Sequence, residues 1–310
     1  MNVGMLGGLV KQAVSAWMDD YAPSMGAALA YYTMFSIAPL LLIAISVAGL
    51  AFGMDAARGE VVAQLQGLMG DSAARAIEAM VQSANKPGEG LASTLVGTTL
   101  LLVGATTVFA ELQDALDRIW RAPERTRRRG IWSLLRERLL SFGLILAIGF
   151  LILVSLVFSA AMAALGRWLG PAFEGWEALA HVVDFVVSFT LVSGLFALIY
   201  KVMPRVHVAW HDVWIGAVVT AALFTIGKLL IGIYIGKSGV TSVFGAAGSF
   251  AVLLLWVYFS AQIFLLGAEF TWVYAHQLGS LRARPQTEAS PERTAAGIPP
   301  TEGEGAKAVD

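Results

Sequence analysis

The side chains that could do chemistry in this sequence are few and widely separated. The chain has no cysteine, and its four histidines stand at positions 181, 207, 211 and 276. Metal-dependent hydrolysis needs histidine and carboxylate ligands at characteristic spacing, and no such pattern occurs here. His207 and His211 are four residues apart, but Trp210-His211-Asp212 is more typical of a helix that begins at a membrane interface. We therefore expect no enzyme activity, no metal site and no cofactor.

Lys228 and Asp184 are the ionisable residues that lie deepest within apolar stretches. Charged side chains inside a membrane are costly and are candidates for function by default. The two residues are expected at similar depth on neighbouring helices, so they could pair as an intramembrane polar site. Alternatively, Lys228 could extend its ammonium group to the lipid headgroups and have no partner in the protein.

A second set of charges lies at the opposite ends of the apolar stretches. It comprises Glu111, Asp114, Arg136, Arg138 and Glu269. Because desolvated charges need partners, these carboxylates and guanidinium groups predict a charge network at the inner face of a helix bundle. The network could act as a gate, but locking of the helix ends is the simpler interpretation.

The composition indicates which elements must position these residues. Apolar residues make up 57% of the chain and charged residues 14%, whereas a soluble domain has about 25% charged residues. About 20 apolar residues in a helix cross a bilayer. The apolar blocks predict an all-α polytopic membrane protein with six transmembrane helices, at about 27–53, 91–110, 139–165, 179–200, 213–235 and 244–274. Pro39 predicts a kink in the first, because proline removes one backbone hydrogen bond.

The segments outside these spans have different expected roles. Residues 1–26 form a lead-in with one amphipathic helix, and residues 27–278 form the membrane domain. Residues 54–90 carry two apolar stripes separated by Gly70-Asp71-Ser72, which predicts a short amphipathic helical hairpin outside the membrane. The hairpin could cover the mouth of the bundle, lie on the headgroups or simply connect two spans. Residues 283–310 are rich in Pro, Glu, Ala, Gly and Thr and are expected to be a disordered tail.

Lysine and arginine are distributed unevenly between the two sides of the predicted bundle. Thirteen fall in the lead-in, two of the loops and the start of the tail, against five in the alternate loops. The positive-inside rule therefore places both termini in the cytoplasm. The arginine run at 125–129 would lie at the inner leaflet, where anionic lipids could bind it. The simpler interpretation of this run is a topology signal.

Three blocks of the sequence resemble the YihY/BrkB family of bacterial inner-membrane proteins, once labelled ribonuclease BN-like. They are AALAYYTMFSIAPLLL at 27–42, ALDRIWR with the arginine-rich link at 115–129, and YIGKSGVTSVFGAAGSFAVLLLWVYFSAQIFLLGAE at 234–269. The chain departs from the family's usual residues at Phe244, where Tyr is common, and at Asp117, where Asn is frequent. The resemblance implies six membrane helices, an inner-membrane location and suggested roles in serum resistance or envelope export.

Two functions are compatible with these observations. The first is a transporter or flippase-like exporter of an amphiphilic or anionic envelope component. The second is a membrane scaffold that assists envelope assembly without transport. The histidines lack the clustering that a nuclease site needs, so ribonuclease activity is not expected. The expected partners are membrane lipids and no nucleic acid, and the sequence leaves a homo-oligomer open.

Overall fold

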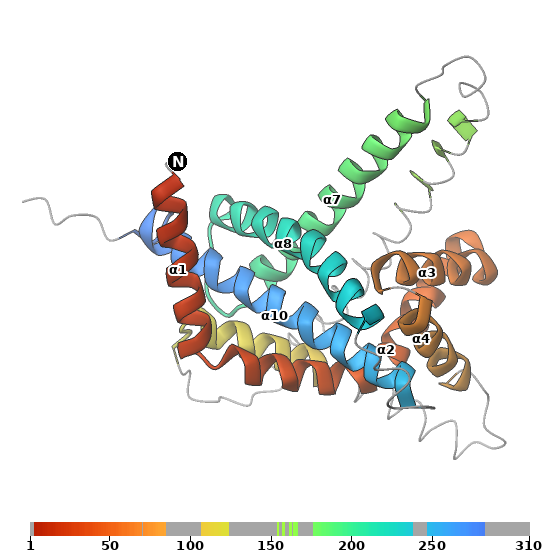
Figure 1. Ribbon diagram of the computed structural model, residues 1–310, viewed down its shortest axis with the longest axis horizontal. Helices are drawn as coiled ribbons and strands as arrows, with labels where there is room; N and C mark the ends of the chain where they lie inside the picture. The colour runs from red at the N-terminus through yellow and green to blue at the C-terminus, as the bar shows by residue number, and fades with distance from the viewer. Residues whose placement is uncertain are drawn as a thin grey trace, which may run out of the picture.

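The computed structural model describes residues 3–69, 71–84, 107–123, 176–237 and 247–282, together with 154, 157–158, 161–162 and 164–166. The described segments are helical, and no strand occurs among them. The helices are α1 (Val3–Asp19), α2 (Ala22–Phe52), α3 (Met54–Met69), α4 (Asp71–Ala84), α7 (Trp176–Val202), α8 (Trp210–Lys237) and α10 (Gly248–Gln277). Residues 107–119 form a further helix, drawn in yellow in Figure 1.

Three of the described helices are long and apolar enough to cross a membrane. They correspond to Leu179–Val202 in α7, Trp210–Ile235 in α8 and Phe250–Gln277 in α10. The sequence predicted spans at 179–200, 213–235 and 244–274, so these three helices are confirmed with small changes at their ends. The predicted span at 27–53 falls on α2, which carries no charged residue and stays helical through Pro39. The predicted spans at 91–110 and 139–165 lie largely outside the described residues.

Helices α8 and α10 make the most extensive helix–helix contact in the described bundle. A Cβ atom placed on Gly216 of α8 would come within 2.7 Å of the Thr271 Cβ, and one on Gly267 of α10 would come within 2.8 Å of the Thr220 Cβ. The threonine side chain of each helix therefore packs directly against the glycine of the other helix. The threonine hydroxyls donate to carbonyl oxygens one turn earlier in their own helices, Thr220 to Gly216 at 2.7 Å and Thr271 to Gly267 at 2.6 Å. Small residues allow this approach, which is typical of helix contacts in membranes.

Helix α7 joins this pair through aromatic side chains. The Tyr200 hydroxyl is fully buried, donates to the Phe264 carbonyl oxygen at 2.7 Å and lies 3.2 Å from the Thr220 hydroxyl. One turn earlier, the Phe196 ring packs edge-on against Phe224, with 5.8 Å between ring centroids. The ring of Trp256 on α10 packs edge-on against the Phe224 ring, with 6.1 Å between ring centroids. Toward its first residues α7 diverges from α8, as Figure 1 shows.

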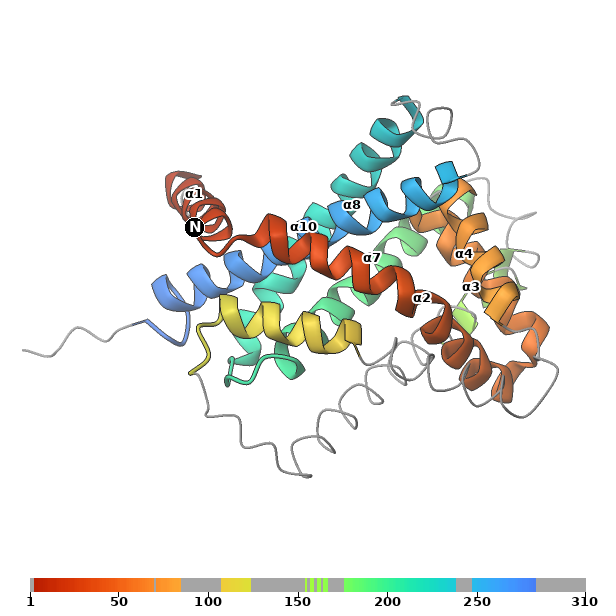
Figure 2. The same ribbon diagram turned by 90° about the horizontal axis from the view of Figure 1, so that it is seen from below.

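The first described helix, α1, and the last turns of the final one, α10, meet at one end of the bundle. Leu9 and Ala13 of α1 pack against Phe270 and Val273 of α10, and the side chains of Gln12 and Gln277 hydrogen-bond. The first turns of α2 and the 107–119 helix share one apolar cluster with α7, α8 and α10. Figures 1 and 2 place the last turns of α10 and the beginnings of α2 and α8 at this same end.

Helices α3 and α4 pack at the opposite end. Ala57 and Val61 of α3 and Ile77 and Val81 of α4 are buried in one cluster with the second half of α2 and the first turns of α10. The figures show the two short helices beside the end of α2 (Figures 1 and 2). The two helices predicted in 54–90 are therefore present, and their apolar residues pack against the end of the bundle. Their place outside the membrane stays a prediction.

The α8–α10 contact predicts a strong response to one added methyl group. Gly216→Ala or Gly267→Ala should lower the free energy of unfolding by about 1–3 kcal/mol, because the methyl group has no space beside the facing threonine. Thermal melts of the purified protein in detergent would measure the loss.

Gly232→Ala is the matched control on α8, since no atom lies within 4 Å of a Cβ placed there. It should be neutral or stabilising, because alanine favours helix over glycine by about 1 kcal/mol. Equal melting temperatures for the Gly216→Ala and Gly232→Ala proteins would contradict the described packing.

Candidate functional site

Glu269 of α10 is the most unusual polar residue of the described bundle. It is 0% exposed, and no hydrogen-bond donor reaches either carboxyl oxygen within the part of the chain that the structure describes. The ionisable groups that act on it most strongly are Asp20, at the turn between α1 and α2, and Arg121, just after the 107–119 helix. The Asp20 carboxyl lies within hydrogen-bonding reach of Glu269. We call these three residues the carboxyl junction.

The two turns that supply Asp20 and Arg121 have an uncommon backbone. Tyr21 and Arg121 have φ angles of 57° and 48°, and they are the non-glycine residues with positive φ in the described chain. Left-handed backbone is unfavourable for residues with a side chain, and it gathers at functional or tightly held sites. Here two cation–π contacts hold the turns. The Arg121 guanidinium lies 4.3 Å from the Trp272 ring centroid, and the Arg118 guanidinium lies 5.7 Å from that of Tyr21.

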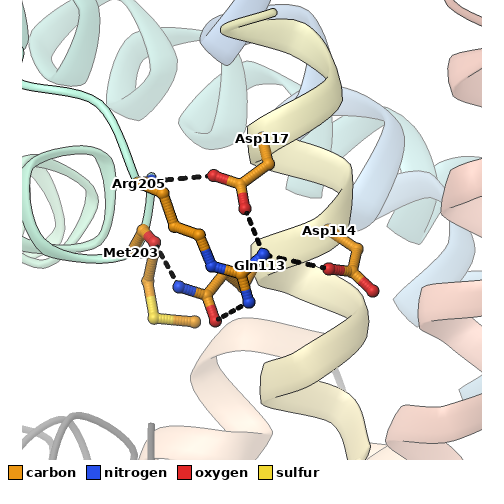
Figure 3. Close-up of polar contacts among 5 residues, drawn as sticks. All are labelled: Gln113, Asp114, Asp117, Met203 and Arg205. Carbon is orange, nitrogen blue, oxygen red and sulfur yellow. Dashed lines mark hydrogen bonds and ion pairs between the residues drawn. The ribbon is translucent and has the colours of Figure 1, made fainter. Parts of the chain in front are cut away.

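A second polar cluster joins the 107–119 helix to the segment that follows α7 (Figure 3). The backbone N–H of Arg205 donates to the Asp117 carboxylate at 2.7 Å, and the Arg205 guanidinium pairs with the same carboxylate at 3.0 Å. Gln113 donates to the Met203 carbonyl oxygen at 3.0 Å. Asp114 contributes a longer ion pair to Arg205, at 3.9 Å. These contacts fix the position of the 107–119 helix along its axis relative to the end of α7.

The pKa values of two carboxyl groups on the 107–119 helix reflect this packing. Burial raises the pKa of Glu111, and the nearby charge of Asp114 raises it further. Burial also raises the pKa of Asp117, although the hydrogen bond and the charge from Arg205 oppose the rise. Both residues follow the predicted span at 91–110 in the sequence. Part of the stability that Asp117 contributes is therefore present at acid pH and is lost as the pH rises through its folded-state pKa.

Asp212 closes the same end of the bundle in the first turn of α8. Its buried carboxylate accepts hydrogen bonds from the Ser280 backbone N–H at 3.0 Å and the Ser280 hydroxyl at 2.6 Å. A carboxylate near a helix N-terminus is favoured by the free N–H groups there. In contrast to Glu269, Asp212 has its donors in place and needs no further partner.

The structure does not bring Lys228 and Asp184 together. Both residues are described, and no ion pair joins them. Phe196 faces Phe224 and Tyr200 faces Thr220, and this register places residue 192 of α7 beside Lys228. Asp184 lies eight residues before position 192, toward the start of α7, which corresponds to about 12 Å at 1.5 Å per residue. Asp184 is exposed on the diverging part of α7, whereas Lys228 is half-buried on α8.

The predicted inner-face network is only partly represented among the described residues. Glu111 and Asp114 lie on the 107–119 helix, and Asp114 takes part in the Arg205 cluster. Glu269 lies in the carboxyl junction, where its cation is Arg121. Arg136 and Arg138 lie outside the described residues. Nor does the structure describe the Pro39 side chain, so the predicted kink in α2 stays a prediction.

Several residues of these clusters were given no structural or functional role by the sequence patterns. Asp20 and Asp117 lie in polar segments at helix ends, where a charged residue is ordinary. Arg121 was counted only as one positive charge of the loop. No sequence pattern distinguished Arg205 or Trp272 from other residues of their segments. Their roles come from contacts between segments about 90 to 250 residues apart, and a single sequence carries little signal for such contacts.

Comparison with known proteins identifies the group to which this bundle belongs. The family model described as "Virulence factor BrkB" matches residues 13–292. The chain belongs to the BrkB family. Its carboxyl junction and Arg205 cluster lie within the matched region, as do all the described helices except residues 3–12 of α1.

Curated relatives of this BrkB-family chain are named as membrane proteins. A UPF0761 membrane protein of Pseudomonas aeruginosa strain PAO1 is 30% identical over 256 residues, which cover 81% of this chain and 59% of the relative. UPF0761 membrane proteins of Ralstonia nicotianae and Acinetobacter baylyi are 29% and 26% identical, over 86% and 79% of this chain. The chain thus spans somewhat less than three fifths of the length of these last two relatives, 58% and 57%. No solved structure matches the chain.

Removing the cation of the second cluster should destabilise the protein in a pH-dependent way. Arg205→Ala leaves the Asp117 carboxylate, whose side chain is 12% exposed, without its guanidinium, and it should cost about 1–3 kcal/mol of unfolding free energy. The loss should be larger at alkaline than at acid pH, because the Asp117 pKa rises further when the opposing charge of Arg205 is gone. Melting temperatures across a pH series would measure this difference.

Asp114→Asn is the control for that series. Its carboxylate side chain is 72% exposed and lies 3.9 Å from Arg205, so its removal should cost less than about 0.5 kcal/mol. A loss in Arg205→Ala that is equal at every pH would contradict the assigned role of Asp117.

Proposed function

We propose that the chain is a multi-pass protein of the bacterial inner membrane that moves an amphiphilic or anionic envelope component across the bilayer. In this proposal six helices cross the membrane, with both termini in the cytoplasm. The three apolar described helices, the uncharged α2 and the uneven distribution of lysine and arginine support that topology. The protein catalyses no covalent reaction in this proposal, and its partners are lipids rather than nucleic acid.

The observation that carries the proposal is the buried carboxyl group of Glu269 in a helix that is able to cross a membrane. Ionisable groups in such helices are rare, face the protein interior and mark ion or substrate pathways. A scaffold has no need of this group, because a buried charged contact is often no more stable than apolar packing of the same volume. Glu269 therefore favours transport over the alternative of a scaffold that assists envelope assembly.

The position of the polar clusters adds support from substrate chemistry. The carboxyl junction and the Arg205 cluster lie at the end of the bundle that the proposal assigns to the cytoplasm. The arginine run at 125–129 begins six residues after the end of the 107–119 helix and would attract anionic headgroups by about 1 kcal/mol per arginine. Anionic lipid or a lipid-linked precursor of the envelope would thus be concentrated at the cytoplasmic entry.

A lipid-translocation assay tests the proposal. The full chain would be reconstituted in vesicles that contain fluorescent phosphatidylglycerol in both leaflets. A membrane-impermeant quencher then reports how fast inner-leaflet lipid reaches the outside. We expect protein-dependent translocation that is faster for phosphatidylglycerol than for phosphatidylcholine, and at least tenfold slower in Glu269→Gln.

Two controls make the assay decisive. Glu111→Gln removes a carboxyl group that is only half-buried and lies outside the junction, so it should keep wild-type rates. Monodisperse elution and a cooperative melt would establish that the Glu269→Gln protein is folded. Translocation no faster than in empty vesicles, for both lipids, would reject transport of this lipid class and favour the scaffold.

A further inference from the structure

The contact between Asp20 and Glu269 lacks a hydrogen-bond donor if both groups are ionised carboxylates. Both Glu269 carboxyl oxygens and Oδ2 of Asp20 are buried without a hydrogen-bond donor in the described part of the chain. The two groups nevertheless lie within hydrogen-bonding reach of each other. Ionised carboxylates only accept hydrogen bonds, so neither group can satisfy the other unless one of them carries a proton.

The charges around Glu269 do not compensate for the pair. The groups that face it are Asp19 and Asp20 from the end of α1, and Arg121 from the turn after the 107–119 helix. Asp19 and Arg121 are exposed to solvent. Helix α2 has no ionisable carboxyl, lysine or arginine, and on α8 the nearest carboxylate, Asp212, is bonded to Ser280. One exposed guanidinium therefore faces the buried carboxyl group of Glu269 and the half-buried one of Asp20. Two carboxyl groups in contact lower their free energy by retaining a proton.

We propose that Asp20 and Glu269 together bind one exchangeable proton, which bridges the α1–α2 turn and α10. With the proton present, one carboxyl group donates to the other and closes the contact. After its release the two carboxylates repel each other, and Arg121 can compensate only one of them. The carboxyl junction is thus a proton-binding site at one end of the bundle. The inference concerns an ion-binding site and holds whether or not the protein transports lipid.

Because of the geometry of the turns, proton binding at this contact should affect how the helices pack. Asp20 directly precedes Tyr21, whose left-handed backbone sets the angle between α1 and α2. Arg121 is itself left-handed and is held on the Trp272 ring of α10. Opening of the Asp20–Glu269 contact would therefore loosen the α1–α2 turn against α10, beside the point where Arg121 contacts Trp272. Proton binding and release would alter the packing of this end as a unit.

Infrared difference spectroscopy tests the proposal on the unmodified chain. Spectra of the reconstituted protein in mildly acid buffer minus mildly alkaline buffer should contain the C=O stretch of a buried protonated carboxyl group. Glu269→Gln and Asp20→Asn should each remove that band, because each leaves only one carboxyl group with an amide donor beside it. Glu111→Gln should retain it.

Thermal stability across the same pH range gives an independent readout. A proton held by the folded protein, and lost from the unfolded chain, stabilises the fold at low pH, so the wild-type melting temperature should fall as the pH rises. The Glu269→Gln melting temperature should fall less over this range, since its amide N–H replaces the proton. The proposal is overturned if the wild-type protein shows no carboxyl band that either junction variant removes. It is equally overturned if the wild-type and Glu269→Gln proteins have the same pH dependence.

Discussion

The close approach of α8 and α10 is the constraint on which the rest of the described structure depends. Lipid tails are as apolar as leucine side chains, so helices in a membrane associate through tight packing rather than through the hydrophobic effect. Gly216 with Thr271, and Thr220 with Gly267, provide that packing in a reciprocal arrangement. The threonine hydroxyls donate within their own helices, so the contact leaves no polar hydrogen without a partner.

This contact also fixes the rotation of α10 about its axis. Gly267 and Thr271 face α8, and Glu269 lies two residues from each. At about 100° per residue, a position two residues away points nearly to the opposite side of the helix. The Glu269 carboxyl is thereby directed away from α8 and toward the α1–α2 turn and Arg121. A close helix contact between apolar surfaces thus determines where the buried carboxyl group of the bundle must lie.

The sequence predicted the elements of this fold better than their contacts. Long apolar blocks identify α7, α8 and α10 because the length of a membrane-crossing helix is set by the bilayer. The stripes in 54–90 identify α3 and α4, because each buries one face. Glu269 was recognisable as a charge at the end of an apolar stretch. For Asp20 and Arg121, in contrast, the relevant signal is a turn conformation that brings distant segments together.

The failure to pair Lys228 with Asp184 has a specific physical cause. Their depths were estimated from the ends of the two apolar stretches, which assumes that neighbouring helices lie side by side over their whole lengths. Instead, the Tyr200 and Phe196 contacts set the register of α7 against α8, and α7 then diverges. The GxxxG spacing of Gly232 and Gly236 does not mark the α8–α10 contact, since no atom lies within 4 Å of a Cβ placed on Gly232. The contact uses glycine and threonine four residues apart, a pairing that the residue types alone do not distinguish from chance.

The most direct test of this account measures whether position 269 is buried, as the rotation of α10 set by its contact with α8 requires. The chain has no cysteine, so Glu269→Cys introduces a single thiol. In native membranes this thiol should resist a membrane-impermeant maleimide from both sides. His276→Cys, at an exposed position of the same helix, should react readily. Adding Gly216→Ala to Glu269→Cys should then raise the labelling rate at 269. Labelling at 269 as fast as at 276 in the folded protein would contradict the account.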